Sequence, residues 1–160
     1  MSDYAASWEL SRSRFLAELE GLSDEQLHWR LQPGALTLAE AAMHVAGVEV
    51  SFSSQLLGIE LDVYGLKLKE AATEGVVNEH PFPYDPKEMS ADEIARALDF
   101  SQKMLAPLIQ NPSPEVLSKE IKSALGPMIT GAGAFARFGF HAAYHQGQAY
   151  LIKNAPGFPT

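Results

Sequence analysis

The chain has 160 residues, and its 20 acidic and 12 basic residues give a formal net charge of −8. A nucleic-acid binder needs a basic patch that displaces counterions from phosphates, so this balance argues against a nucleic-acid partner. The absence of cysteine excludes disulfides, thiolate metal ligands and a cysteine nucleophile, and it fits a cytoplasmic protein. Signal-peptide and membrane-spanning patterns are absent, so we expect no membrane partner. The length predicts a single domain over residues 1–160.

The first half of the chain contains two predicted long helices. Residues Tyr4–Glu20 carry apolar side chains at the three- and four-residue spacing of one helix face. Ser23–Gln26 has the pattern of a capping box, in which the first and fourth residues bond each other's backbone amides, and it predicts one short helical turn. Thr37 and Glu40 repeat this pattern ahead of an Ala- and Val-rich run, and predict a second long helix over Leu38–Leu57.

The second half contains two more predicted long helices. Ser90 and Glu93 again have the capping pattern, and the helical periodicity that follows predicts a helix over Ala91–Gln110. A further apolar stripe predicts the last helix over Thr130–Lys153. Clear apolar and polar alternation and the usual hairpin turns are absent, so we expect no strand pair.

Residues 59–89 form an unusually long connection between the second and third long helices. Within it, Leu66–Ala72 is predicted as a short helix, whereas His80–Pro86 must be extended because each residue before a proline is kept out of the α region. Connections of this length are usually functional or mobile. Four long helices with this one long connection predict an all-α fold, a four-helix bundle.

Three histidines are candidate metal ligands. His141 and His145 are four residues apart, which places two imidazoles one turn apart on a helix face that also carries Phe138 and Gln148. His44 lies among apolar residues of the second long helix, where a lone histidine is more commonly a hydrogen-bonded core residue. Together the three form a ligand set from two facing helices with an open position for water or substrate. Imidazole suits Zn, Ni, Fe or Cu, and we expect Zn²⁺ or Ni²⁺.

Ligating imidazoles need polar partners for their second ring nitrogen. Glu40, Glu49 and Gln148 are close enough in sequence to provide them. Other roles compete for two of these residues. Glu40 belongs to a capping box, and Glu49 could equally lie on a solvated helix face.

The long connection would bring its own side chains to the metal if it folds over the bundle. His80, Tyr84 and Asp62 are then candidates for contact with a substrate, and Phe138 for the wall of a pocket. Without such folding, His80 and His28 are predicted to lie at the surface.

Two segments resemble the DinB-like proteins of the DinB/YfiT superfamily. They are GLSDEQLHWRLQPGALTLAEAAMHVAGVEVSF, which contains His-x-Ala-Gly-x-Glu, and HAAYHQGQAYLIK, which contains His-x-x-x-His-x-Gly-Gln. The resemblance covers essentially the whole chain. It implies a four-helix bundle with a long connection between helices two and three, a divalent metal ion held by His44, His141 and His145, and a homodimer. Gln146 stands where the family usually has a basic residue, which removes the charge that an anion contact there would need.

The resemblance implies several functions. Some relatives use mycothiol, bacillithiol or glutathione, so the leading expectation is a metal-dependent enzyme that activates a low-molecular-weight thiol for transfer or isomerisation on a small-molecule electrophile. The metal would lower the pKa of that thiol. The first alternative is a metal-dependent hydrolase that activates water, with Glu49 moving the proton. The second alternative is a non-catalytic, stress-associated dimer that binds a metal or another ligand.

Overall fold

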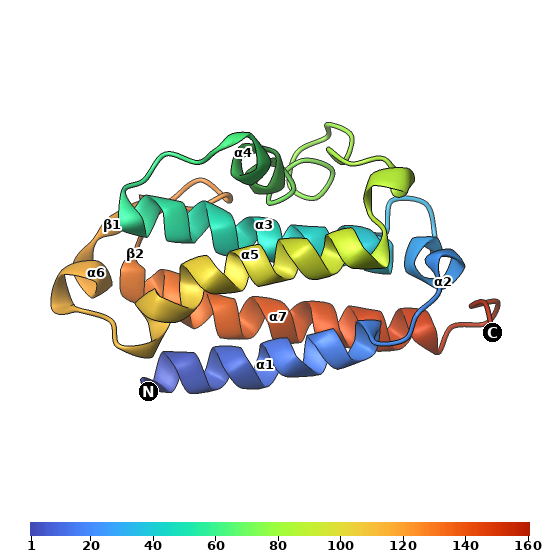
Figure 1. Cartoon of the computed structure of the whole chain (residues 1–160), viewed down its shortest axis with the longest axis horizontal. Coiled ribbons are helices and arrows are strands. Elements are labelled where there is room, and N and C mark those ends of the chain that lie inside the picture. Colours follow the sequence, from blue (N-terminus) through green and yellow to red (C-terminus); the bar gives the residue numbers. More distant parts are fainter.

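The computed structural model describes the whole chain, from Met1 to Thr160, and is mostly helical. Its four long helices are α1 (Asp3–Leu19), α3 (Leu38–Leu57), α5 (Ala91–Gln110) and α7 (Gly131–Lys153), as Figure 1 shows. Helix α1 packs along α7, α3 packs along α5, and α3 also contacts α7. The predicted all-α four-helix bundle is therefore confirmed.

Short-range contacts set the ends of these helices. The Thr37 hydroxyl accepts a hydrogen bond from the Glu40 amide at 3.1 Å, and the Glu40 carboxylate accepts one from the Thr37 amide at 2.8 Å. This capping box starts α3 where predicted, and Gly58, in the left-handed region at φ 66°, ends it. Helix α5 also has its predicted bounds, and α1 and α7 differ from prediction by one residue.

The long connection follows from the directions of the helices. Helices α3 and α5 run the same way in Figure 1, so the chain must return along the 20 residues of α3, a distance of about 30 Å. The connection contains α4 (Val63–Glu70) and the short 3-10 helix η1 (Pro86–Glu88). Helix α4 starts earlier than the predicted Leu66–Ala72 because the Asp62 side chain accepts a hydrogen bond from the Gly65 amide at 2.8 Å.

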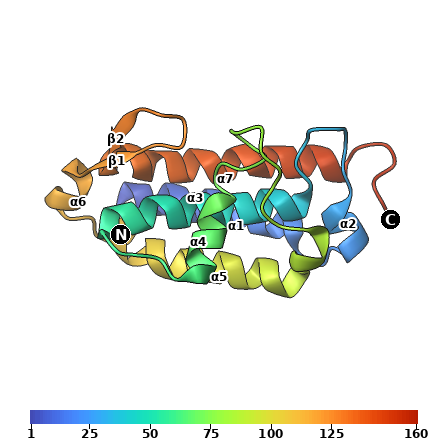
Figure 2. The same cartoon turned by 90° about the horizontal axis from the view of Figure 1, so that it is seen from above.

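The prediction that the chain contains no strand pair is wrong. Strand β1 (Glu120–Lys122) pairs antiparallel with β2 (Met128–Thr130), beside the start of α7 (Figure 2). Three-residue strands are too short to show an alternating pattern, and tertiary contacts hold this hairpin. Ile121 is buried in the core, and the Gln55 side chain bonds both the amide and the carbonyl of Lys122.

Short helices close the two ends of the bundle. They are α2 (Asp24–His28), with the predicted capping box of Ser23 and Gln26, and α6 (Pro114–Ser118). No helix combines the length and the apolar character that crossing a membrane requires.

Candidate metal centre

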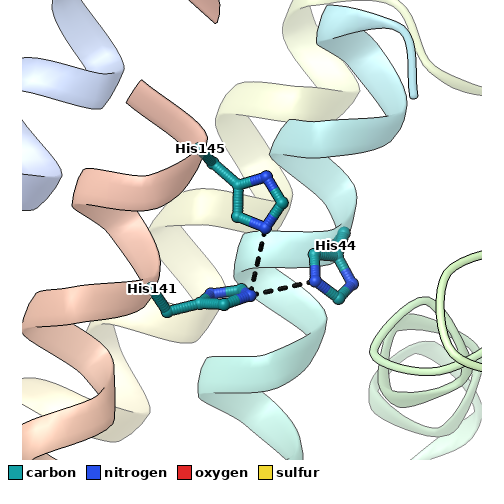
Figure 3. Close-up of side chains that lie close together, drawn as sticks. All are labelled: His44, His141 and His145. Carbon is teal, nitrogen blue, oxygen red and sulfur yellow. Dashed lines mark hydrogen bonds between the residues drawn. The ribbon is translucent and has the colours of Figure 1, made fainter. Parts of the chain in front are cut away.

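The three predicted ligand residues meet between α3 and α7. His44 lies in the second turn of α3, and His141 and His145 lie one turn apart on α7, with their rings turned toward one another (Figure 3). Nε2 of His141 is 2.9 Å from Nε2 of His44 and 3.1 Å from Nε2 of His145. One ring nitrogen from each histidine lies within 4.8 Å of the others, so this group could hold a metal ion.

The connection fixes the orientation of His44. Its Nδ1 lies 2.8 Å from the backbone oxygen of Ala71, just after α4. A carbonyl oxygen can only accept, so Nδ1 carries the hydrogen and Nε2 presents its lone pair to the other two histidines. A ring nitrogen held in this way is the usual support for a metal-ligating histidine.

Gly47 allows the connection to come this close to α3. A Cβ atom on Gly47 would lie 2.5 Å from the backbone oxygen of Leu68 and 2.9 Å from the backbone nitrogen of Ala72. Any larger residue would therefore push the connection away from the helix. Because Gly47 lies one turn after His44, the same contact brings Ala71 onto the imidazole.

Burial keeps the three imidazoles uncharged. Burial, followed by the effect of the two neighbouring histidines, lowers the pKa of His141 to about 2. Burial first, and His44 second, lower the pKa of His145 to about 3. Burial also lowers the pKa of His44, and the bond to Ala71 opposes this shift. Neutral imidazole is the form that binds a metal ion.

Hydrogen bonds alone leave these nitrogens incompletely satisfied. If His141 donates its Nε2 hydrogen to His44, it has no second hydrogen for His145. Nδ1 of His145 is buried without a hydrogen-bond partner. The Gln148 side chain lies near this ring and acts to raise the pKa of His145, against the larger effect of burial. Zinc–nitrogen bonds of about 2 Å place neighbouring ligand nitrogens roughly 3.3 Å apart at a tetrahedral ion. Two of the three separations, 2.9 and 3.1 Å, are close to this value and all three lie within 4.8 Å, so the residues fit a divalent metal.

Glu49 belongs to a different buried group. Its carboxylate accepts hydrogen bonds from Trp8 Nε1 at 2.8 Å and Arg12 Nε at 3.1 Å, both on α1, and from the Ser101 hydroxyl at 2.5 Å on α5. Its side chain is buried, so the alternative of a solvated helix face is excluded. The structure does not bring Glu49 into the histidine group, and its partners show that it joins α1 and α5 to α3.

Two other sequence candidates also make structural contacts. Glu40 caps α3 and forms an ion pair with Arg30 at 2.6 Å. Phe138 is buried in the core, with its ring 5.7 Å from that of Phe52 and 6.3 Å from that of Phe135. Phe138 therefore packs against Phe52, and Phe52, not Phe138, lines the cleft described below.

The polar residues predicted for the connection lie away from the histidines. His80 is exposed and bonds Glu74 at 2.7 Å. Tyr84 packs into the core, where burial, ahead of the nearby carboxylates, raises its pKa to about 12. Asp62 caps α4. None of the three lines either of the clefts that reach the histidines.

Two clefts reach the histidine group. The first, of about 320 Å³, is lined by His44 and His141, by the connection at Val76, and by mostly apolar side chains of α3, α7 and the hairpin loop. The second, of about 400 Å³, reaches His145 and includes Gln148, and Val76 also lines it. No carboxylate lines either cleft. The connection thus folds over the bundle beside the histidines, as expected, but the residues that it places there are apolar and not His80, Tyr84 or Asp62.

Two polar residues of the first cleft were not found by sequence reasoning. Arg137 and Ser123 line it together with His141. Arg137 belongs to no motif, and its only sequence signal is that it precedes His141 by four residues on one helix face. Ser123 lies in the loop of the hairpin that the sequence did not predict.

A family model described as the DinB superfamily matches residues 7–149. The chain belongs to the DinB superfamily. No curated protein matches it. This DinB-superfamily chain is similar to the crystal structure of a conserved protein from Enterococcus faecalis, with a TM-score of 0.68 and 16% sequence identity over 94% of this chain and 92% of that one. At this identity the likeness shows a shared fold alone.

Proposed function

We propose that this DinB-superfamily protein is an enzyme that holds Zn²⁺ or Ni²⁺ through His44, His141 and His145 and activates a low-molecular-weight thiol. The thiol would then be transferred to a small electrophile or assist its isomerisation. The observation that carries this proposal is the convergence of three neutral imidazoles beside an open cleft, those of His44 and His145 buried and that of His141 half-buried. A divalent ion in such a site lowers the pKa of a thiol or of water.

The lining of the clefts favours a thiol over water as the nucleophile. A hydrolase that follows the sequence-based alternative needs Glu49 to move a proton, but the oxygens of Glu49 are occupied by Trp8, Arg12 and Ser101. With no carboxylate in the clefts, a nucleophile that is readily deprotonated at neutral pH fits better. Because the chain has no cysteine, the sulfur must come from a cosubstrate.

Metal analysis tests the centre. Purified, untagged protein is expected to bind about one equivalent of Zn²⁺ or Ni²⁺, as a three-histidine site requires. His141→Ala should lose the metal because it breaks the ligand set. His80→Ala, which removes an exposed histidine outside the centre, is the matched control and should keep it. A full equivalent of metal in His141→Ala would contradict the proposed site.

Turnover tests the reaction. Metal-loaded protein is incubated with a chlorinated dinitrobenzene and with glutathione, bacillithiol or mycothiol in turn. The expected reaction forms a carbon–sulfur bond, breaks the carbon–chlorine bond, and releases chloride and the proton of the thiol. It should require both thiol and metal and be lost in His141→Ala. Hydrolysis of a nitrophenyl ester without thiol would favour the hydrolase, and full metal occupancy without turnover in either assay would favour the non-catalytic dimer.

We also propose that two copies of the chain associate through α7. Phe140, Tyr144 and Leu151 are 69%, 53% and 65% exposed and lie on one side of this helix. Gly147 lies among them with open space where a Cβ would stand. A contiguous apolar surface of this kind is typical of protein–protein contact.

A further inference from the structure

The cleft beside the metal centre contains a basic side chain without an acidic partner. Arg137 lies on α7 four residues before His141, so the two side chains share a helix face about one turn apart. Arg137 is half-buried, and none of the ion pairs of the chain includes it. By contrast, the buried Arg12 is paired with Glu49. The chain has a net charge of −8 and many carboxylates, yet none of them pairs with this partly buried arginine. A charge in such a position is costly unless a partner binds it.

The hairpin loop holds the guanidinium of Arg137 in place. Its Nη1 donates to the Ser123 hydroxyl oxygen at 2.6 Å, and the Leu125 amide donates to the same oxygen at 3.2 Å. Arginine has five N–H donors, and no protein acceptor takes the others. The hydroxyl hydrogen of Ser123, itself a buried residue, is also given to no protein acceptor. Fixed, unused donors therefore stand at one end of the cleft.

Apart from the two histidines, the rest of the cleft is apolar. Val48 and Phe52 of α3, Val77 of the connection and Phe140 of α7 line it. A ligand that satisfies both parts needs a hydrocarbon body and a negatively charged end. The planar fork of arginine matches the two oxygens of a carboxylate, and one hydroxyl beside it adds a single donor. A carboxylate carries one negative charge, which Arg137 alone balances, whereas a phosphate dianion carries about two and would need a second cation.

We propose that Arg137 and Ser123 form an anion-binding end of the cleft, and that the electrophile of this protein is a small apolar carboxylate. This inference rests on the proposed function, because it assigns the substrate class of the same site. Arg137 binds the carboxylate, and the apolar walls bind the body. Since Arg137 and His141 are one helical turn apart, a ligand of a few heavy atoms reaches both.

Paired probes test this inference without any substitution. Phenylacetate and phenylacetamide have nearly the same size and differ in charge. Their binding to the full chain is measured by calorimetry or NMR, with and without bound Zn²⁺. Phenylacetate is expected to bind about 10-fold more tightly than the amide in both forms, as one hydrogen-bonded charge pair allows.

Variants then assign the charge preference to its residues. Arg137→Gln should abolish it, and Ser123→Ala should reduce it because the guanidinium loses its anchor. Arg14→Gln removes the same charge from an exposed position of α1 and should leave the preference unchanged. Arg137→Lys keeps the charge without the fork and should retain part of it.

The metal-free measurement separates this inference from the proposed function. If the chain binds no metal but still prefers phenylacetate, the anion site stands and the metal enzyme is refuted. If the chain binds a full equivalent of metal but shows no preference, the metal centre stands and the anion site is refuted. A preference seen only with Zn²⁺ would assign the carboxylate to the metal and overturn the role of Arg137. Equal affinities, or no binding of either probe, would overturn it as well.

Discussion

Inside the bundle, Glu49 carries a charge that its partners make tolerable. A carboxylate buried without partners is strongly disfavoured, and donors from Trp8, Arg12 and Ser101 offset that cost. The arrangement links three helices through one side chain. It also means that either member of the Arg12–Glu49 pair depends on the other to stay buried.

The charge of Glu49 is therefore expected to matter for stability and not for metal binding. Glu49→Gln should lower the free energy of unfolding by about 3–5 kcal/mol, because Arg12 would stay buried without a counter-charge. Urea denaturation measures this change. The metal content of the same samples should not change, since Glu49 lies outside the histidine group.

A double variant provides the control for this substitution. Arg12→Met combined with Glu49→Leu removes both charges and should recover most of the lost stability. Glu49→Gln protein that unfolds like the parent, or that has lost its metal, would contradict the structural role given to this residue.

The contact between α3 and the connection depends on one glycine. Gly47→Ala should push the connection outward, because the new Cβ would stand 2.5 Å from the Leu68 oxygen. We expect a loss of about 1–3 kcal/mol in the free energy of unfolding, as for an overpacked core. Zinc affinity should fall by about 10–100-fold, because His44 would lose the support of Ala71.

Gly133→Ala is the matched control on α7, where a Cβ meets only ordinary contacts at 3.6 and 3.7 Å. Alanine favours a helix by about 1 kcal/mol over glycine, so this variant should be at least as stable as the parent. Denaturation and a zinc competition titration of both variants measure the two effects. A Gly47→Ala protein with the zinc affinity of the parent would show that the connection does not orient His44.

Interactions that span a few residues made the helices predictable. The Thr37–Glu40 capping box sets the start of α3 through bonds between residues three positions apart. Helix geometry alone places His141 and His145 on one face, and the apolar neighbours of His44 indicate that it points inward. These signals, with the family resemblance, were enough to predict both the bundle and the residues that meet at its centre.

Contacts between distant segments were not predictable in the same way. Trp8 and Arg12 lie 41 and 37 residues from Glu49, and no local pattern indicates that they bond it. The hairpin depends on tertiary contacts such as the burial of Ile121. Arg137 is a candidate binding residue only because Ser123 of that hairpin bonds it and because it lines an apolar cleft. Helix spacing thus determines the histidine group, and tertiary packing determines its surroundings.

The whole fold makes the metal-free protein sensitive to acid. In the unfolded chain the three histidines have the ordinary pKa of 6.5, whereas the fold lowers the pKa of His141 to about 2, that of His145 to about 3, and also that of His44. Below pH 6.5 the unfolded state therefore binds more protons. The free energy of unfolding should fall as the pH falls from neutrality, by up to about 1.4 kcal/mol per pH unit for each histidine.

Urea denaturation of chelator-treated protein across this pH range measures the fall. His141→Leu should make the dependence shallower by the contribution of one proton, and His80→Ala, at an exposed position, should leave the slope unchanged. A free energy of unfolding that is constant between neutrality and mildly acidic pH would contradict the lowered pKa values of the three histidines.

The exposed face of α7 gives a prediction for the assembly. Light scattering is expected to give twice the mass of one chain, and Leu151→Glu should shift it to one chain by placing a charge in the apolar contact. Leu10→Glu changes a leucine of similar exposure on α1, 57% against 65%, and should remain dimeric. A parent protein with the mass of one chain would refute the association.

A cysteine-free chain has no disulfide to join its distant parts. An ion held by His44 and His141 would provide such a crosslink between residues 97 positions apart. In the chain-entropy treatment of crosslinks, closing a loop of about 100 residues stabilises the fold by about 4–5 kcal/mol. Unlike a disulfide, this link would open to a chelator and not to a reductant. The resistance of the protein to unfolding would then follow the supply of metal and not the redox state of its surroundings.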